Sequence, residues 1–195
     1  MRELMFGARR FGEIKVNLPG VSANVLTQRL ESLAANGIVV RYRLPSPANV
    51  QVYGLTDWGR ESEGVIRDLG HWAARSPRHN PLAFMSPASA MMSLCALIDR
   101  DRAAVLTATV AFRFPADAFV VRVADGDITV ARGTGEAGDA AVVFTGDTLA
   151  MRYTIYGKRP LSRGGAGGTL AVEGDMETAQ RFIDLFALPE KILLE

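Results

Sequence analysis

The sequence predicts an α+β fold in two domains, residues 1–76 and 82–195, and three observations support this prediction. Helical patterns with one short hairpin fill the first part, whereas several strands and three helices fill the second. Pro77 and Pro81 interrupt helix on both sides of the segment between them, which is typical of a short, stiff connection. Residues 1–60 carry eight basic and four acidic side chains, a net charge of +4, so the remainder of this +1 chain carries −3.

The first domain begins with two predicted helices. Residues 10–18 have apolar side chains at helical spacing, and a Pro-Gly pair ends this short helix. Ser22 is a good N-cap for the next helix, because its hydroxyl can accept a hydrogen bond from a free amide of the first turn. Residues 22–36 then carry a narrow apolar stripe and end at an Asn-Gly pair. The stripe consists of Leu26, Leu30 and Leu33.

A hairpin and a longer helix complete the first domain. Residues 38–44 alternate as a half-exposed strand, and residues 50–55 return as a second strand after a Pro-rich turn. The alternation puts Ile38, Val40, Tyr42 and Leu44 on one side of the first strand. Thr56 then caps a predicted long helix with an apolar ridge. The ridge consists of Trp58, Val65, Ile66, Leu69 and Trp72.

This order of helix, tight turn, helix and hairpin is typical of a winged helix-turn-helix, whose partner is double-stranded DNA. Amide and guanidinium groups near the start of the second helix can pair with base edges in the major groove. Arginines on the hairpin can neutralise phosphates or enter the minor groove. The candidate DNA-binding residues are Ser22, Asn24, Thr27, Gln28, Arg29, Arg41, Arg43 and Asn49. The alternative is an ordinary solvated helix face, on which Arg29 could pair with Glu31.

Several short motifs in residues 2–75 also resemble the HxlR-type winged-helix regulators. They are Arg2-Glu3-Leu4-Met5-Phe6-Gly7, Arg10-Phe11-Gly12-Glu13-Ile14, Leu18-Pro19-Gly20-Val21-Ser22, Leu26-Thr27-Gln28-Arg29-Leu30 and Val52-Tyr53-Gly54-Leu55-Thr56. The resemblance implies a homodimer on an inverted-repeat operator, with the helix over residues 22–36 reading bases. It also implies that the helix after Thr56 takes part in dimer contacts.

The second domain alternates strands and capped helices. A Ser-Pro pair at residues 86–87 starts a helix, and Asp147 caps a second one. Gly174-Asp175 leads into a third helix, which is expected to bear Ala179, Phe182, Ile183 and Phe186. The helix after Asp147 is expected to bear Leu149, Tyr153 and Tyr156 on one side. Strands are predicted over residues 105–114, 118–124, 128–132, 141–145 and 169–173, with a tight turn at residues 125–127.

Residues 85–190 resemble the sterol carrier protein 2 fold. The resemblance rests on Val120-Val121-Arg122-Val123, Phe144-Thr145-Gly146-Asp147 and Leu170-Ala171-Val172-Glu173-Gly174-Asp175. It implies a mainly antiparallel five-stranded sheet whose flanking helices enclose an apolar tunnel. The ligand would be a fatty acid, an isoprenoid or another apolar small molecule, because Met and aromatic side chains suit adaptable apolar pockets. The candidate lining residues are Met91, Cys95, Ile98, Phe112, Phe144, Leu149, Tyr153, Phe182 and Phe186. The alternative is that these side chains form an ordinary core.

Other classes of protein and site are not indicated by the sequence. Two distant histidines and one cysteine do not make a metal site, and we expect no cofactor. Neither a phosphate-binding loop nor an acid–base pair of carboxylates is recognisable, so we expect no enzyme. We also expect no membrane span, since no apolar run approaches about 18 residues. The single cysteine and the lack of a charged-then-apolar leader after Met1 favour the cytoplasm.

Two hypotheses of function follow. The first is a dimeric DNA-binding regulator whose affinity responds to an apolar ligand in the second domain. The second is a carrier of lipids or other hydrophobic small molecules, in which the winged helix serves only for dimerisation.

Overall fold

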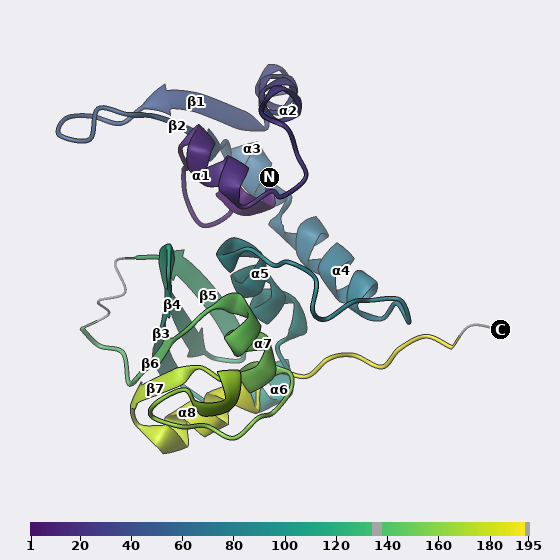
Figure 1. The fold of residues 1–195 in the computed structure, drawn as a ribbon, viewed down its shortest axis with the longest axis vertical. Coiled ribbons are helices and arrows are strands. Elements are labelled where there is room, and N and C mark those ends of the chain that lie inside the picture. Colours follow the sequence, from purple (N-terminus) through teal and green to yellow (C-terminus); the bar gives the residue numbers. More distant parts are fainter. Residues whose placement is uncertain (134–137, 194–195) are drawn as a thin grey trace. The chain divides into compact units, whose positions relative to one another are not determined.

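A computed structural model of the chain describes residues 1–133 and 138–193 (Figure 1). The chain divides into two compact units, Met1–Ile66 and Arg67–Glu195. The domain boundaries expected from the sequence, residues 1–76 and 82–195, stay a prediction. Among the described residues, no helix is both long enough and apolar enough to cross a membrane.

The first unit is a helix-turn-helix followed by a two-stranded wing, as predicted. Its elements are η1 (Arg2–Leu4), α1 (Phe11–Val16), α2 (Ala23–Ala35), β1 (Val39–Arg43), β2 (Gln51–Leu55), α3 (Asp57–Glu61) and the start of α4 (Glu63–Ala74). One or two residues from each of five elements fill a small core, which is what holds these short segments together. The core consists of Leu4, Ile14, Leu26, Leu30, Val39 and Leu55.

Two expectations for the first unit were wrong. The long helix after Thr56 is two helices, α3 and α4, that meet at Ser62. The Ser62 hydroxyl donates a 2.6 Å hydrogen bond to the carbonyl of Gly59, which competes with regular helical bonding. In β1 the core residue is Val39, at 3% exposed, whereas Val40 and Tyr42 on the apolar side are more than 40% exposed. Only the first residue of this strand packs into the core. The alternation of apolar and polar residues along β1 therefore does not identify the buried face.

The second unit is an α+β domain built on one five-stranded sheet. It contains α5 (Pro87–Leu97), α6 (Arg100–Ala103), β3 (Ala108–Phe114), β4 (Asp117–Ala124), β5 (Asp127–Arg132), β6 (Val142–Thr145), α7 (Thr148–Ile155), η2 (Ala166–Gly168), β7 (Ala171–Gly174) and α8 (Met176–Ile183). The strand order is β5-β4-β3-β6-β7, and only β3 and β6 pair in parallel. The sheet is therefore mixed but mainly antiparallel, as predicted.

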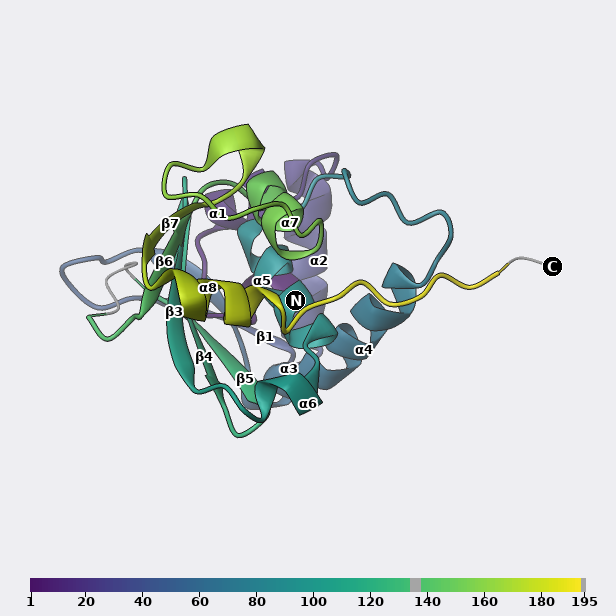
Figure 2. The ribbon, with the colours of Figure 1, turned by 90° about the horizontal axis from the view of Figure 1, so that it is seen from below.

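Helices cover this sheet. Figures 1 and 2 show α5 and α7 side by side on one side of it, and α8 contacts β6 and β7. The predicted tight turn is confirmed, since Asp125 and Gly126 both have positive φ angles, of 52° and 77°. The predicted caps are confirmed as well: Ser86 and Asp147 each accept a hydrogen bond from a backbone amide of the helix that follows. Asp175 caps α8 in the same way.

Two details of the second unit differ from the prediction. The strand expected from residue 105 begins at Ala108, because Asp99 caps the short helix α6 that the sequence analysis missed. Helix α7 buries Ala150, Met151, Thr154 and Ile155 rather than the predicted Leu149, Tyr153 and Tyr156. Each tyrosine has a partner at the edge of the core: the ring of Tyr153 lies under the guanidinium of Arg159, and the Tyr156 hydroxyl bonds Ser93.

Candidate functional site

Helix α2 has one buried and one exposed side. Leu26 and Leu30 are each 4% exposed and pack in the core of the first unit. On the other side, Asn24, Gln28, Arg29 and Glu31 are exposed, and Thr27 is half-buried. The Ser22 hydroxyl accepts a 3.2 Å hydrogen bond from the Val25 amide, so the predicted N-cap is present and the start of the helix is defined. The polar side chains of this first turn and of the next are therefore free to contact a partner.

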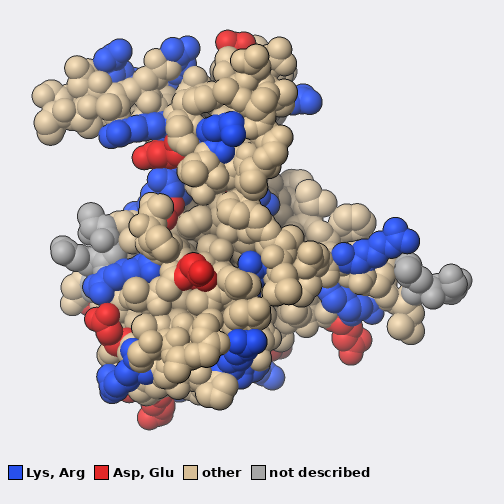
Figure 3. All heavy atoms as spheres, viewed as in Figure 1, with Lys and Arg blue, Asp and Glu red and all other residues tan. Residues whose placement is uncertain are grey.

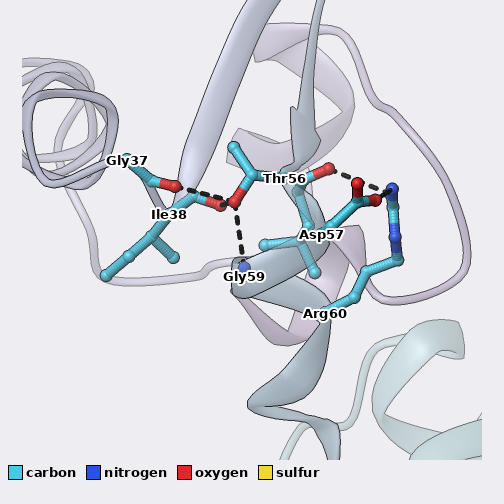
Figure 4. A network of polar contacts seen from close by, with 7 residues as sticks. Gly37, Ile38, Thr56, Asp57, Gly59 and Arg60 are labelled. Atoms are coloured by element: carbon cyan, nitrogen blue, oxygen red, sulfur yellow. Dashed lines mark hydrogen bonds and ion pairs between the residues drawn. The ribbon is translucent and has the colours of Figure 1, made fainter.

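A compact polar network fixes the end of α2 to the start of α3 (Figure 4). The Thr56 hydroxyl donates a 2.7 Å hydrogen bond to the carbonyl of Gly37 and accepts one of 2.9 Å from the amide of Gly59. Arg60 reaches back to the carbonyl of Leu55 and pairs with Asp57. Because Gly37 follows α2 and Leu55 ends β2, the network sets the angle between this helix and the wing.

The wing, which comprises β1, β2 and the turn over residues 44–50, carries the two predicted arginines. The guanidinium of Arg41 donates a 2.7 Å hydrogen bond to the side-chain oxygen of Gln51. The guanidinium of Arg43 donates to the backbone and side-chain oxygens of Asn49, both at 3.3 Å. Both arginines are exposed, and Figure 3 shows basic side chains along this hairpin. Thus Arg41, Arg43 and Asn49 lie together on the wing, whereas Ser22, Asn24, Thr27, Gln28 and Arg29 lie on α2.

The predicted ligand-binding residues of the second unit fall into two groups. Six of them are buried, namely Met91, Cys95, Phe112, Phe144, Phe182 and Phe186. The four phenylalanine rings pack against one another, with centroids 5.1 to 6.1 Å apart in the contacting pairs. Ile98, Leu149 and Tyr153 are only half-buried. Such close packing of the phenylalanine rings agrees with the alternative that these residues form an ordinary core.

A hollow of about 340 Å³ in the second unit was not foreseen from the sequence. Its lining comes from α4, α5, the residue after α5, and α6. The lining residues are Arg67, Asp68, His71, Cys95, Ala96, Ile98 and Arg100. Two residues expected in an apolar cavity, Cys95 and Ile98, therefore border a hollow whose other side chains are mostly charged or polar. In the described part of the chain, no group of three or more His, Cys, Asp or Glu side chains could hold a metal ion.

Sequence reasoning also missed two polar pairs. The first is Arg41 with Gln51, which becomes visible only once the strand register is known. The second is the Tyr156 hydroxyl with Ser93, at 2.7 Å. Burial raises the pKa of Tyr156 well above its ordinary value, and this hydrogen bond opposes the rise only in part. The phenol is therefore a neutral structural group that ties α7 to α5.

Comparison with known protein families finds two matches along the chain. Residues 1–80 match the family model of HxlR-like helix-turn-helix proteins. Residues 92–187 match the model of the SCP-2 sterol transfer family. The two matches cover separate segments, and the first extends beyond Ile66, where the first unit ends.

Individual relatives match part of the chain. The uncharacterised HTH-type transcriptional regulator YvaP of Bacillus subtilis strain 168 is 36% identical over 72 residues, which are 36% of this chain and 66% of YvaP. The HTH-type transcriptional regulator YodB of the same strain is 37% identical over 70 residues, or 36% of this chain and 62% of YodB. This chain thus spans slightly less than two thirds of the length of either relative. The solved structure of YodB in its reduced form is 34% identical, with a TM-score of 0.36, over 39% of this chain and 74% of that chain.

Proposed function

Because the chain belongs, through residues 1–80, to the HxlR-like helix-turn-helix family, we propose that it is a DNA-binding transcriptional regulator that acts as a homodimer on an inverted-repeat operator. The observation that carries this proposal is the exposed polar side of α2 next to a wing with two exposed arginines. A single helix fits the major groove, and phosphate contacts from a wing fix its register. A cytoplasmic location is part of the proposal, since a regulator works where the chromosome lies.

Within this proposal the side chains have different tasks. Asn24 and Gln28 read base edges, because a side-chain amide both donates and accepts hydrogen bonds and can bind adenine in a paired manner. Ser22, Thr27 and Arg29 add contacts along the same side of α2. Arg41 and Arg43 contact phosphates, which bind with little regard to sequence.

A gel-shift assay on the region upstream of the protein's own gene tests the proposal. We expect the wild-type protein to prefer this duplex to a scrambled one, and Gln28→Ala to lose about 1–3 kcal/mol of that preference. Arg41→Ala should weaken binding to both duplexes alike. The matched control is Gln180→Ala, which removes the same exposed helical amide from α8 in the second unit. If Gln28→Ala discriminates between the duplexes as well as Gln180→Ala does, the base-reading role of Gln28 is wrong.

The second part of the proposal is that an apolar ligand held by the second unit modulates DNA binding. It is supported by the match of residues 92–187 to a sterol transfer family and by the buried Met and Phe side chains of α5, β3, β6 and α8. A ligand acts in this way only if it favours one DNA-binding geometry over another. Entry of a fatty acid or isoprenoid would have to separate the phenylalanine rings that now touch, since closely packed interiors leave little free volume.

The same match favours a second candidate function, that of a carrier for lipids or other hydrophobic small molecules. Native mass spectrometry of the purified protein shows whether such a molecule is retained, and the gel shift shows whether DNA is bound. A retained lipid without any DNA binding favours the carrier. DNA binding whose affinity changes when the lipid is removed favours the ligand-responsive regulator.

A further inference from the structure

The two arginines of the wing share a bonding pattern that the rest of the first unit lacks. Arg41 bonds the side-chain oxygen of Gln51, and Arg43 bonds that of Asn49. In both cases the acceptor is a neutral amide from β2 or the turn before it. Gln51 lies directly opposite Arg43 in the register, so its bond to Arg41 runs diagonally across the hairpin.

Three other arginines of the first unit pair with carboxylates. Arg2 pairs with Glu3, Arg9 with Glu13 and Arg60 with Asp57. Neither wing arginine forms an ion pair with any residue that the structure describes. The difference matters electrostatically, because a carboxylate cancels the charge of a guanidinium whereas an amide oxygen leaves the full positive charge in place. An arginine also has five N–H donors, so one bond to an amide leaves the others available.

We propose that Gln51 and Asn49 are positioning residues, which hold the guanidinium groups of Arg41 and Arg43 ready for the phosphates of duplex DNA without neutralising them. The inference rests on the proposed DNA-binding function. It adds Gln51 to the candidate residues and gives Asn49, a candidate already, a task through Arg43. A long side chain that is already ordered loses less conformational entropy when it binds a phosphate. The amide partners therefore raise affinity for any duplex, whatever its sequence.

The test compares Gln51→Ala with Gln51→Glu. Binding of a fluorescent duplex of mixed sequence is measured by anisotropy over a range of salt concentrations. Gln51→Ala should weaken binding about threefold and leave the salt dependence nearly unchanged, because Arg41 keeps its charge but loses its support. Gln51→Glu should weaken binding further and lower the salt dependence by about one phosphate contact, as Arg41→Ala does, because the new carboxylate pairs with Arg41. Asn49→Asp should do the same through Arg43.

The control for net charge is Thr129→Glu, which adds a negative charge at an exposed position of β5 in the second unit and should leave both quantities unchanged. Gln51→Ala is also measured in the Arg41→Ala background, where its effect should vanish. Circular dichroism confirms that each variant is folded. An equal effect of Gln51→Ala in both backgrounds, or wild-type salt dependence in Gln51→Glu, would overturn the inference alone. Failure of the wild-type protein to bind any duplex would overturn the proposed function as well.

Discussion

Gly59 occupies a position in the first unit that has no room for a side chain. A Cβ atom there would lie 2.2 Å from the carbonyl oxygen of Ile38, a backbone atom that cannot rotate away. We expect Gly59→Ala to lower the free energy of unfolding by at least about 2 kcal/mol, because the network around Thr56 must open to admit the methyl group. Urea unfolding followed by circular dichroism measures the loss.

Gly64→Ala is the matched control for this substitution. Gly64 also lies in a helix, and a Cβ atom there would have no neighbour within 4 Å. Alanine should be neutral or slightly stabilising at this site, since glycine is a poor helix former. Equal unfolding curves for Gly59→Ala and the wild type would show that the segment around Ile38 and Gly59 can make room for a methyl group without loss of stability.

At the residue scale, helix caps were predictable from the sequence, whereas hydrogen bonds between residues far apart in the chain were not. Ser22 and Thr56 were recognised as caps because a hydroxyl before a helix acts within one turn. The contact of Thr56 with Gly37 spans 19 positions in the chain, and that of Arg41 with Gln51 needs the register of the hairpin. The exposed side of α2 followed from leucine spacing alone, so the candidate base-reading residues needed no tertiary information.

At the scale of elements, α8 begins at a carboxylate cap whose strength depends on pH. Asp175 accepts hydrogen bonds from the amide and the hydroxyl of Thr178, at 2.9 and 2.5 Å, and these bonds lower its pKa. Because the folded-state pKa lies below the unfolded value of about 3.9, the cap stabilises the fold above that pH and is lost as pH falls through the folded pKa.

We therefore expect the stability difference between the wild type and Asp175→Asn to shrink on acidification. Asparagine also caps helices, but it does not titrate. Thermal unfolding of both proteins between neutral pH and about pH 3 gives the difference at each pH. A gap that stays constant down to the acid end would contradict the assignment of the cap to the charged carboxylate.

The sequence predicted some elements wrongly because it did not show which residues of the helix are buried or where the helix breaks. In α7 the tyrosines gave the larger apolar signal, yet Met151 and Ile155 are the fully buried residues, because each tyrosine has a polar or cationic partner at the edge of the core. The break between α3 and α4 lies at Ser62, whose hydroxyl donates a hydrogen bond to the carbonyl of Gly59. By contrast α8 was predicted correctly, since Ala179, Phe182 and Ile183 fall on one face of a helix that is otherwise polar.

At the scale of the whole molecule, the α+β class and the two-part organisation were predictable because patterning changes near the prolines of residues 76–81. The pairing of the strands was harder to predict from the sequence. The parallel contact between β3 and β6 joins residues about 30 positions apart and gives no local signal. Exposed apolar side chains on α4 bear on the proposed homodimer.

Two side chains of α4 in the second unit, Leu69 and Trp72, form an apolar surface. They are 58% and 69% exposed. Because large exposed apolar patches mark interaction sites, we expect this surface to bury itself in the proposed homodimer. Leu69→Glu should yield a monomer in size-exclusion chromatography with light scattering, whereas the neighbouring exposed substitution Asp68→Asn should leave the dimer intact. A wild-type monomer, or a Leu69→Glu variant of dimeric mass, would contradict the proposed dimer.

The central claim is that the exposed side of α2 touches DNA, and site-specific photo-crosslinking tests it most directly. A photoreactive side chain at position 31 occupies this side of α2 without replacing a proposed base-reading residue, and one at position 129 of β5 serves as the control. With the upstream duplex bound, irradiation should join DNA to the protein from position 31 and not from position 129. Bound DNA that crosslinks only from position 129 would contradict the account.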